Sequence, residues 1–134
     1  MNALIADDEL VSRKKMQKIM ESFGESTTVE TGADAVTTFK ESLRRGKPFD
    51  LVTLDIMMPD MDGLRALMEI RDAERKNWIK TGDEHPQVKI MMVTSHSKKE
   101  LVLGCVKAGA NSFVVKPFDR DIIIEKLKEM GFSV

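Results

Sequence analysis

Polar side chains follow four of the five strands that the sequence predicts, at the point where each strand ends. They are Asp7 and Asp8, Asp55, Thr94 and Lys116. The carboxyl ends of parallel strands lie at one edge of a sheet, and ligands of such sheets bind there. A capping or turn role would account for any one of these residues, but hardly for all of them together. The sequence therefore predicts a polar site at this edge.

The three aspartates limit what this site can bind. At an effective dielectric of about 20, two carboxylates ~4 Å apart repel each other by about 4 kcal/mol, so a cluster of three must take up protons or bind cations. Lys116 offsets one of the charges. The remaining charge and the all-oxygen ligand set favour Mg²⁺, whereas the His and Cys ligands that zinc prefers are missing from the site.

The same residues have the chemistry that phosphoryl transfer requires, which is a nucleophile held in line and positive charge around the transferred group. Asp55 is the candidate nucleophile and would form an aspartyl-phosphate. Lys116 and Mg²⁺ would stabilise the negative charge. Thr94 would donate a hydrogen bond to the phosphoryl group.

The elements that hold these residues alternate between strand and helix along the chain. Short apolar runs predict strands over residues 3–6, 51–54, 88–93 and 113–115, and a β-prone stretch predicts one over residues 27–30; each is followed by a helical pattern. The short apolar run 51–54 indicates a strand that is covered on both faces. Five such units predict a doubly wound α/β fold, in which helices cover both faces of a parallel sheet.

Local patterns also predict where helices begin and which faces they bury. The predicted N-caps are Thr31, Asp62, Ser97 and Asp119. The apolar faces are predicted to include Leu67 and Met68 in the third helix, and Cys105 and Val106 in the fourth. Because Cys105 is the only cysteine, an internal disulfide is excluded, and we expect this buried thiol to be inert.

Composition limits the class of partner. The chain has 134 residues, 42% of them hydrophobic and 32% charged, with a formal net charge of −1, which fits one globular domain. The balanced charge and the absence of a basic run argue against nucleic-acid binding as the main activity. No segment has the length of a signal peptide core or a membrane span. We therefore expect a cytoplasmic protein that binds neither nucleic acid nor membrane.

Five motifs, in order along the chain, carry a family resemblance. They are Asp7-Asp8, residues 55–63, residues 93–95, residues 108–111 and residues 116–118. Together they resemble the response-regulator receiver domains of two-component signalling, the CheY-like family, over essentially the whole chain. The resemblance implies a flavodoxin-like (βα)5 fold with strand order 2-1-3-4-5. It also implies a single receiver domain over residues 1–134, with no effector domain.

The resemblance further implies a role for each site residue. Asp55 would accept a phosphoryl group from a histidine of a sensor kinase or a histidine-phosphotransfer protein. Mg²⁺ would be held by Asp8, Asp55 and the backbone carbonyl of Met57, with Asp7 acting largely through water. The protein would be primarily a signalling switch that catalyses its own phosphotransfer and dephosphorylation.

The switch residues implied by the resemblance are Thr94 and Phe113. Phosphorylation adds negative charge and acceptor oxygens, so Thr94 would move toward the phosphoryl group and Phe113 would turn inward behind it. Because Phe113 has no hydroxyl, its part would be packing alone, and an ordinary core phenylalanine is the alternative. The resemblance also implies a cis peptide bond between Lys116 and Pro117.

Two departures from the family pattern lead to further expectations. Met57 and His96, beside the phosphorylation pocket, are poorly suited to orienting an attacking water, so we expect a long-lived aspartyl-phosphate. The segment 71–87 is longer than usual, and Trp78 there either extends the apolar face of a helix or contacts a partner. Output is expected through an unknown downstream protein, or a homodimer, at the last two helices.

Two other functional classes remain open from the residues alone. A Mg²⁺-dependent phosphatase would form an aspartyl-phosphate on a similar sheet, but its second acid would fall at Met57. A flavodoxin-like FMN protein would need a phosphate-binding loop after the first strand, where Asp7 and Asp8 would repel the phosphate. Turnover of small phosphoesters would indicate the first class, and flavin colour the second.

Overall fold

The computed structural model describes residues 1–82, 87–95 and 98–134. Two sequence-based expectations, the N-cap at Ser97 and the role of His96, lie outside the described residues. All five predicted strands and the five helices that follow them are present.

The core of the fold is a five-stranded parallel sheet. Its strands are β1 (Asn2–Ala6), β2 (Glu25–Val29), β3 (Leu51–Asp55), β4 (Lys89–Thr94) and β5 (Ser112–Val115), in the order β2-β1-β3-β4-β5. This arrangement confirms the predicted fold class and strand order. β3 is central and is buried along its whole length, because helices cover both of its faces.

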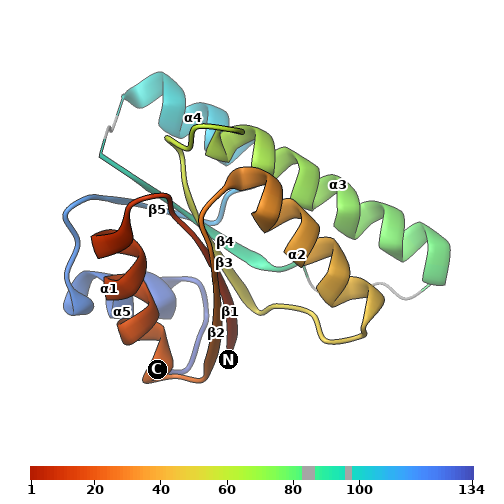
Figure 1. Cartoon of the computed structure of the whole chain (residues 1–134), viewed down its shortest axis with the longest axis horizontal. Helices are drawn as coiled ribbons and strands as arrows, with labels where there is room; N and C mark the ends of the chain where they lie inside the picture. The colour runs from red at the N-terminus through yellow and green to blue at the C-terminus, as the bar shows by residue number, and fades with distance from the viewer. Residues whose placement is uncertain (83–86, 96–97) are drawn as a thin grey trace.

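Five helices cover the two faces of the sheet (Figure 1). They are α1 (Leu10–Glu21), α2 (Gly32–Arg44), α3 (Gly63–Thr81), α4 (Lys99–Lys107) and α5 (Arg120–Glu129). α1 and α5 lie on one face, and α2, α3 and α4 lie on the other. Each face therefore has its own apolar core, and the sheet lies between the two cores.

Three of the predicted N-caps are confirmed. The side chain of Thr31 accepts a hydrogen bond from the backbone N–H of Asp34 at 3.0 Å. Asp62 and Asp119 cap α3 and α5 in the same way, at 2.8 and 2.9 Å. These side chains satisfy amide groups that have no partner within the helix, so the turns before α2, α3 and α5 are fixed locally.

Two residues predicted on buried faces are instead exposed. Met68 in α3 is 56% exposed and Val106 in α4 is 57% exposed. Each follows a fully buried residue, Leu67 and Cys105 respectively. One position along a helix turns the side chain by about 100°, and α3 and α4 contact the core through a narrower stripe than the sequence pattern suggested.

The long segment after residue 71 is largely a continuation of α3. This helix runs for 19 residues to Thr81, and Gly82 ends it with a left-handed φ of 75°. Trp78 lies in this extension and is 45% exposed. The extension therefore carries α3 past the end of α2 and leaves an aromatic side chain partly open to solvent.

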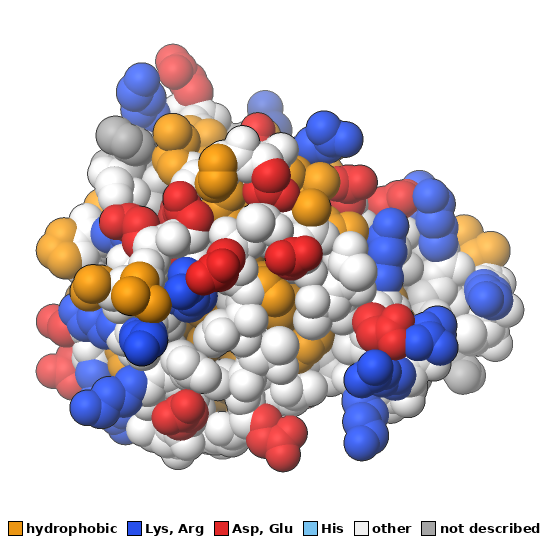
Figure 2. Space-filling model, viewed as in Figure 1, with side chains coloured by type: hydrophobic (Ala, Val, Ile, Leu, Met, Phe, Trp, Pro, Cys, Tyr) orange, Lys and Arg blue, Asp and Glu red, His pale blue; other side chains and the backbone are white. Residues whose placement is uncertain are grey.

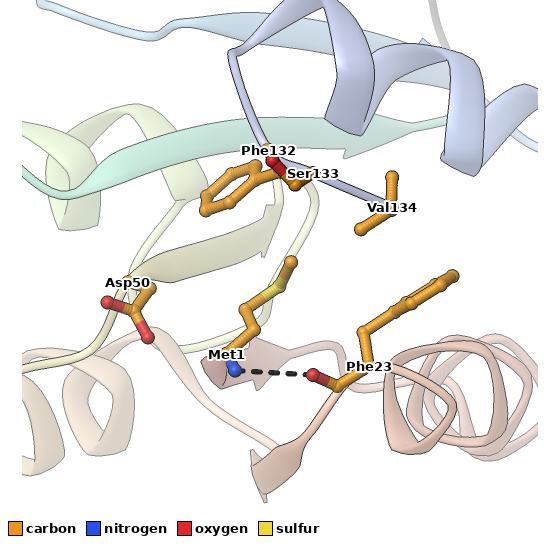
Figure 3. A pocket seen from close by; sticks show the side chains of 6 residues that line it. All are labelled: Met1, Phe23, Asp50, Phe132, Ser133 and Val134. Carbon is orange, nitrogen blue, oxygen red and sulfur yellow. Dashed lines mark hydrogen bonds between the residues drawn. The ribbon is translucent and has the colours of Figure 1, made fainter.

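The two ends of the chain lie close together (Figure 1). The amino group of Met1 donates a hydrogen bond to the carbonyl of Phe23 at 3.2 Å. Figure 3 shows the small cavity at this end, of 360 Å³, with the side chains of Met1, Phe23, Phe132 and Val134 around it. The segment after α5 thereby closes the core of the α1–α5 face.

Charged side chains of both signs are spread over the face shown in Figure 2. Within the described ranges, every helix is too short or too polar to cross a lipid bilayer.

A largely buried polar network joins α3 to the start of β5. The guanidinium of Arg71 donates to the carbonyl of Gly109 at 2.8 Å and to the side-chain oxygen of Asn111 at 2.9 Å. It also forms an ion pair with Glu74 at 2.7 Å. The same Asn111 oxygen accepts from the N–H of Ile90. Arg71 thus connects a helix, a strand and the loop before β5.

Replacing Arg71 by Ala should destabilise the protein by about 2–4 kcal/mol, because several partly buried groups lose their partner at once. The matched control is Arg75→Ala, whose ion pair with Asp72 is exposed and should contribute less than about 0.5 kcal/mol. Urea unfolding of both variants measures the difference. Similar losses in the two variants would contradict a structural role for the network.

Candidate functional site

Three aspartates meet at the carboxyl ends of β1 and β3. Asp7 and Asp8 follow β1, and Asp55 is the last residue of β3. One carboxylate oxygen from each lies within 4.8 Å of those of the other two. Asp7 and Asp55 are buried, whereas Asp8 is exposed. The cluster therefore has a closed inner side and an open outer side.

Lys116 reaches into this cluster from the end of β5. Its ammonium nitrogen lies 3.1 Å from Asp55 Oδ2 and 3.1 Å from Asp7 Oδ2. The shortest contact, at 2.6 Å, is to Oε1 of Glu9. The lysine side chain is only 7% exposed. The cation is thus held among three carboxylates, and the peptide bond that follows it, Lys116-Pro117, is cis as expected.

Burial raises the pKa of Asp55 to about 7. Lys116 favours the ionised form and opposes this shift, while the neighbouring carboxylate of Asp7 adds to it. Burial also disfavours the charged form of Lys116, but hydrogen bonds to Glu9 and Asp7 and the charge of Asp55 outweigh it, so the pKa of Lys116 is raised. The lysine is firmly protonated, and one ammonium does not fully neutralise the buried acids.

The loop after Asp55 folds back against the end of β3. Oδ1 of Asp55 accepts a hydrogen bond from the N–H of Met57 at 3.2 Å, and the N–H of Gly63 donates to the carbonyl of Ile56 at 2.8 Å. A Cβ atom on Gly63 would lie 2.4 Å from the carbonyl oxygen of Asp55. Only glycine permits this close approach, which fixes the backbone on both sides of the acid.

Two residues whose contacts the sequence did not reveal support the site from outside. Arg13 in α1 donates to the backbone carbonyl of Asp7 at 2.9 Å and forms an ion pair with Glu30 at 2.9 Å. Asp60, in the loop after β3, accepts hydrogen bonds from the N–H groups of Gly32 and Ala33 at the start of α2. These bonds hold the pKa of the exposed Asp60 below its usual range.

Glu9 is the site residue that sequence reasoning missed. It directly follows the two aspartates, so a third consecutive acid was the available signal. Its contact with Lys116 depends on how α1 leaves the sheet, which the pattern of residues does not specify.

The remaining candidate residues surround the cluster. Thr94 is fully buried at the end of β4, and its carbonyl accepts from the N–H of Lys116 at 2.7 Å. Phe113 in β5 is half-buried and packs against the core of the α2–α4 face. Met57 is 60% exposed. Cys105 is fully buried, and burial raises the pKa of its thiol, which disfavours the reactive thiolate.

The donor set fits a hard divalent cation. Three carboxylates supply oxygen ligands, and the exposed Asp8 leaves an open side for water or phosphate oxygens. Mg²⁺ prefers such a mixture of one or two carboxylates, waters and a phosphate oxygen. A cation here would also relieve the repulsion between the buried acids that Lys116 leaves in place.

Comparison with known protein families matches residues 3–128 to the response regulator receiver domain. The chain belongs to this family. Its receiver domain is similar to the chemotaxis protein CheY of Bacillus subtilis, with 34% identity over 128 residues that cover 94% of this chain and 93% of that protein. This match favours the receiver over the phosphatase and flavodoxin classes that the residues alone left open.

Two other similar proteins are a much longer kinase and a CheY whose structure was solved in a complex. The hybrid signal transduction histidine kinase L of Dictyostelium discoideum is 35% identical over 129 residues, which are 96% of this chain but 7% of that kinase. The CheY of Borrelia burgdorferi, solved in a CheX-CheY-BeF3-Mg²⁺ complex, is 29% identical with a TM-score of 0.78, covering 99% of this chain and 90% of that one.

A plant receiver domain has the same fold. The receiver domain of the histidine kinase CKI1 from Arabidopsis thaliana, solved with Mg²⁺ and BeF3⁻, is 25% identical with a TM-score of 0.78 and covers 96% of this chain and 88% of that one. The protein is thus a CheY-like receiver domain of two-component signalling, with an acidic triad of the kind that suits Mg²⁺.

The raised pKa of Asp55 predicts how stability depends on pH when no divalent metal is present. The folded state disfavours the ionised acid, so a penalty that is absent below about pH 4 grows as the pH rises through about 7. Asp55→Asn removes that penalty. We expect this variant to be about 2 kcal/mol more stable than the wild type at pH 8, with the gap closing at pH 4.

Thermal or urea unfolding in EDTA measures this difference, and adding Mg²⁺ should narrow it by stabilising the wild type. The control is Asp8→Asn, which changes an exposed carboxylate and should alter stability less. A less stable Asp55→Asn variant at pH 8 in EDTA would contradict the electrostatic account.

Proposed function

We propose that the protein accepts a phosphoryl group on Asp55 from a phosphohistidine of a sensor kinase or a histidine-phosphotransfer protein. Receiver domains interact with histidine kinases, and this chain is a receiver domain. The observation that carries the proposal is the convergence of Asp7, Asp8 and Asp55 around one sheet edge, with the Lys116 ammonium 3.1 Å from Asp55.

In the proposed reaction, a carboxylate oxygen of Asp55 attacks phosphorus and the P–N bond to the donor histidine breaks. The histidine nitrogen leaves with the bonding electron pair and takes up a proton. Lys116 neutralises charge that develops on the phosphoryl oxygens, as it now does for the carboxylate. The neighbouring N–H of Met57 already points at Asp55 Oδ1 and helps to orient the acid.

The residues proposed to hold Mg²⁺ are Asp8, Asp55 and the backbone carbonyl of Met57, with Asp7 acting through water. When bound, the ion supplies positive charge that keeps Asp55 ionised and lowers the cost of bringing a phosphoryl group to an acidic site. Because Asp7 is buried and already hydrogen-bonded to Lys116, its oxygens are less available than those of the exposed Asp8.

Thr94 and Phe113 are the proposed switch. Thr94 lies at the end of β4, beside the strand that carries Asp55, so its hydroxyl can approach a phosphoryl group with little backbone movement. Phe113 pairs with Met92 on the neighbouring strand and is half-buried, so an inward turn would bury more of its ring. In this proposal, phosphorylation changes the charge at the site, and the packing of Phe113 changes in response.

Signal output is proposed to occur by protein binding, with residues 1–134 acting as a single domain in the cytoplasm. α4, β5 and α5 expose several large apolar side chains that the core does not use. They are Leu103, Val106, Val115 and Ile122. This surface is the proposed contact for a downstream protein or for a second copy of the chain.

Acetyl phosphate should add the mass of one phosphoryl group to the wild type in the presence of Mg²⁺, and intact-mass spectrometry detects it. Asp55→Asn should gain none, and EDTA should suppress the reaction in the wild type. Asp50→Asn is the control, because Asp50 precedes the opposite end of the same strand and should not matter. Phosphorylation of Asp55→Asn at the wild-type level would refute the assignment.

Met57→Asn should shorten the lifetime of the aspartyl-phosphate several-fold, because an amide can orient the attacking water and a thioether cannot. Decay of the phosphorylated mass after removal of acetyl phosphate measures the lifetime. Met68→Asn is the control, since Met68 has similar exposure but lies on α3. Equal lifetimes for wild type and Met57→Asn would show that residue 57 does not set the rate.

A further inference from the structure

A groove of 1380 Å³ runs between the C-terminal halves of α2 and α3. Asp50, which precedes β3, and Lys89, which begins β4, line one end of it. It therefore lies at the edge of the sheet opposite the acidic cluster. None of the residues placed in the phosphorylation site lines it.

The groove has an apolar floor and partly exposed apolar walls. Phe39, Phe49 and Val88 form buried parts of its lining. Met68 and Trp78 from α3 stand on its side and are 56% and 45% exposed. The part of α3 beyond residue 71 supplies Trp78 and with it part of the wall of the groove.

Three of the four acids that line the groove have partners within hydrogen-bond distance. Glu74 pairs with Arg71, and Asp72 pairs with Arg75 and Lys76. Asp50 accepts from the N–H of Asn2 at 2.7 Å. The fourth acid, Glu69, lies 3.8 Å from Arg65, and its buried Oε2 accepts no hydrogen bond from the described residues. The groove therefore offers mainly apolar surface, and most of its negative charge is already paired.

Basic side chains concentrate along the two helices that form the groove. Figure 2 shows Lys and Arg gathered over the C-terminal parts of α2 and α3. The exposed basic residues there are Lys40, Arg44, Arg45, Lys47, Arg75, Lys76 and Lys80. Glu41 and Asp72 are the acids paired with some of them. In a chain with a net charge of −1, this is a local excess of positive charge.

We propose that this groove binds an acidic amphipathic helix of a partner protein. A helix that presents apolar side chains at i, i+3, i+4 and i+7 fills an apolar groove, and acids on its flanks would meet the basic edges on both sides. The concave shape with a buried floor suits inserted side chains. A flat bilayer would instead need apolar groups that protrude.

The proposal does not depend on the phosphorylation chemistry, because the two sites lie at opposite edges of the sheet. Docking at the groove would leave the acidic cluster and the exposed surface of α4 and α5 open to other proteins. The partner would therefore be held beside the receiver whether or not Asp55 is phosphorylated.

Trp78 is the only tryptophan in the chain, so its fluorescence reports binding at the groove directly. The probe is a synthetic helix of about 18 residues, with Leu at i, i+3, i+4 and i+7, Glu at the flanking positions and no aromatic residue. The reference is the same helix with Lys in place of Glu. We expect the Glu helix to shift the Trp78 emission to the blue and to bind at least about tenfold more tightly than the Lys helix.

Substitutions on the groove should weaken binding of the Glu helix, and a matched substitution elsewhere should not. Met68→Glu and Arg75→Glu each change an exposed residue that lines the groove, and we expect at least about tenfold weaker binding. Lys18→Glu reverses an exposed positive charge in the same way as Arg75→Glu but lies on α1, and it should bind normally. All three should still be phosphorylated by acetyl phosphate, which separates this test from that of the site.

Several results would overturn the proposal. They are a Trp78 emission that does not respond to the Glu helix, a Lys helix that binds as tightly as the Glu helix, and a Met68→Glu variant that binds the Glu helix as the wild type does. A larger response to phosphatidylserine vesicles or to single-stranded DNA than to the Glu helix would assign the groove to a different class of partner.

Discussion

The structure depends on one buried ammonium that is shared among carboxylates. Lys116 lies 3.1 Å from both Asp7 and Asp55 and 2.6 Å from Glu9. Its single positive charge stabilises the two buried acids at the sheet edge but does not balance all of their negative charge. Burial, with a smaller contribution from the neighbouring carboxylate of Asp7, raises the pKa of Asp55 to about 7. A site that is short of positive charge in this way is prepared to take a divalent cation, and with it an incoming phosphoryl group.

The topology explains why these groups meet. In the order β2-β1-β3-β4-β5, β1 lies beside β3. The chain adds β2 on one side of this central pair and β4 and β5 on the other side. The carboxyl ends of β1 and β3 therefore form the bottom of a crevice, and β4 and β5 bring Thr94 and Lys116 to the same edge. Arg13 and Gly63 then fix the backbone of the two buried acids from opposite sides.

Most of the fold and of the candidate site could be predicted from the sequence, because the signals were local. Apolar runs located four of the strands, and β-prone residues located β2. Thr31, Asp62 and Asp119 marked helix starts, and the acids followed strand ends. What could not be predicted depended on long-range packing. The contact of Glu9 with Lys116 spans most of the chain, and the exposure of Met68 and Val106 reflects how narrowly α3 and α4 touch the core. Helical periodicity in the sequence does not specify how wide the buried stripe of a helix is.

Asp60 connects the loop that follows Asp55 to α2, a helix that contributes no residue to the acidic cluster. Asp60 comes five residues after Asp55 and caps the first amides of α2, which otherwise have no partner within the helix. A displacement of this loop would uncap α2 and loosen its first turn. An event at Asp55 that displaces this loop would therefore lower the free energy needed to open the first turn of α2, and amide hydrogen exchange at Gly32 and Ala33 would report it.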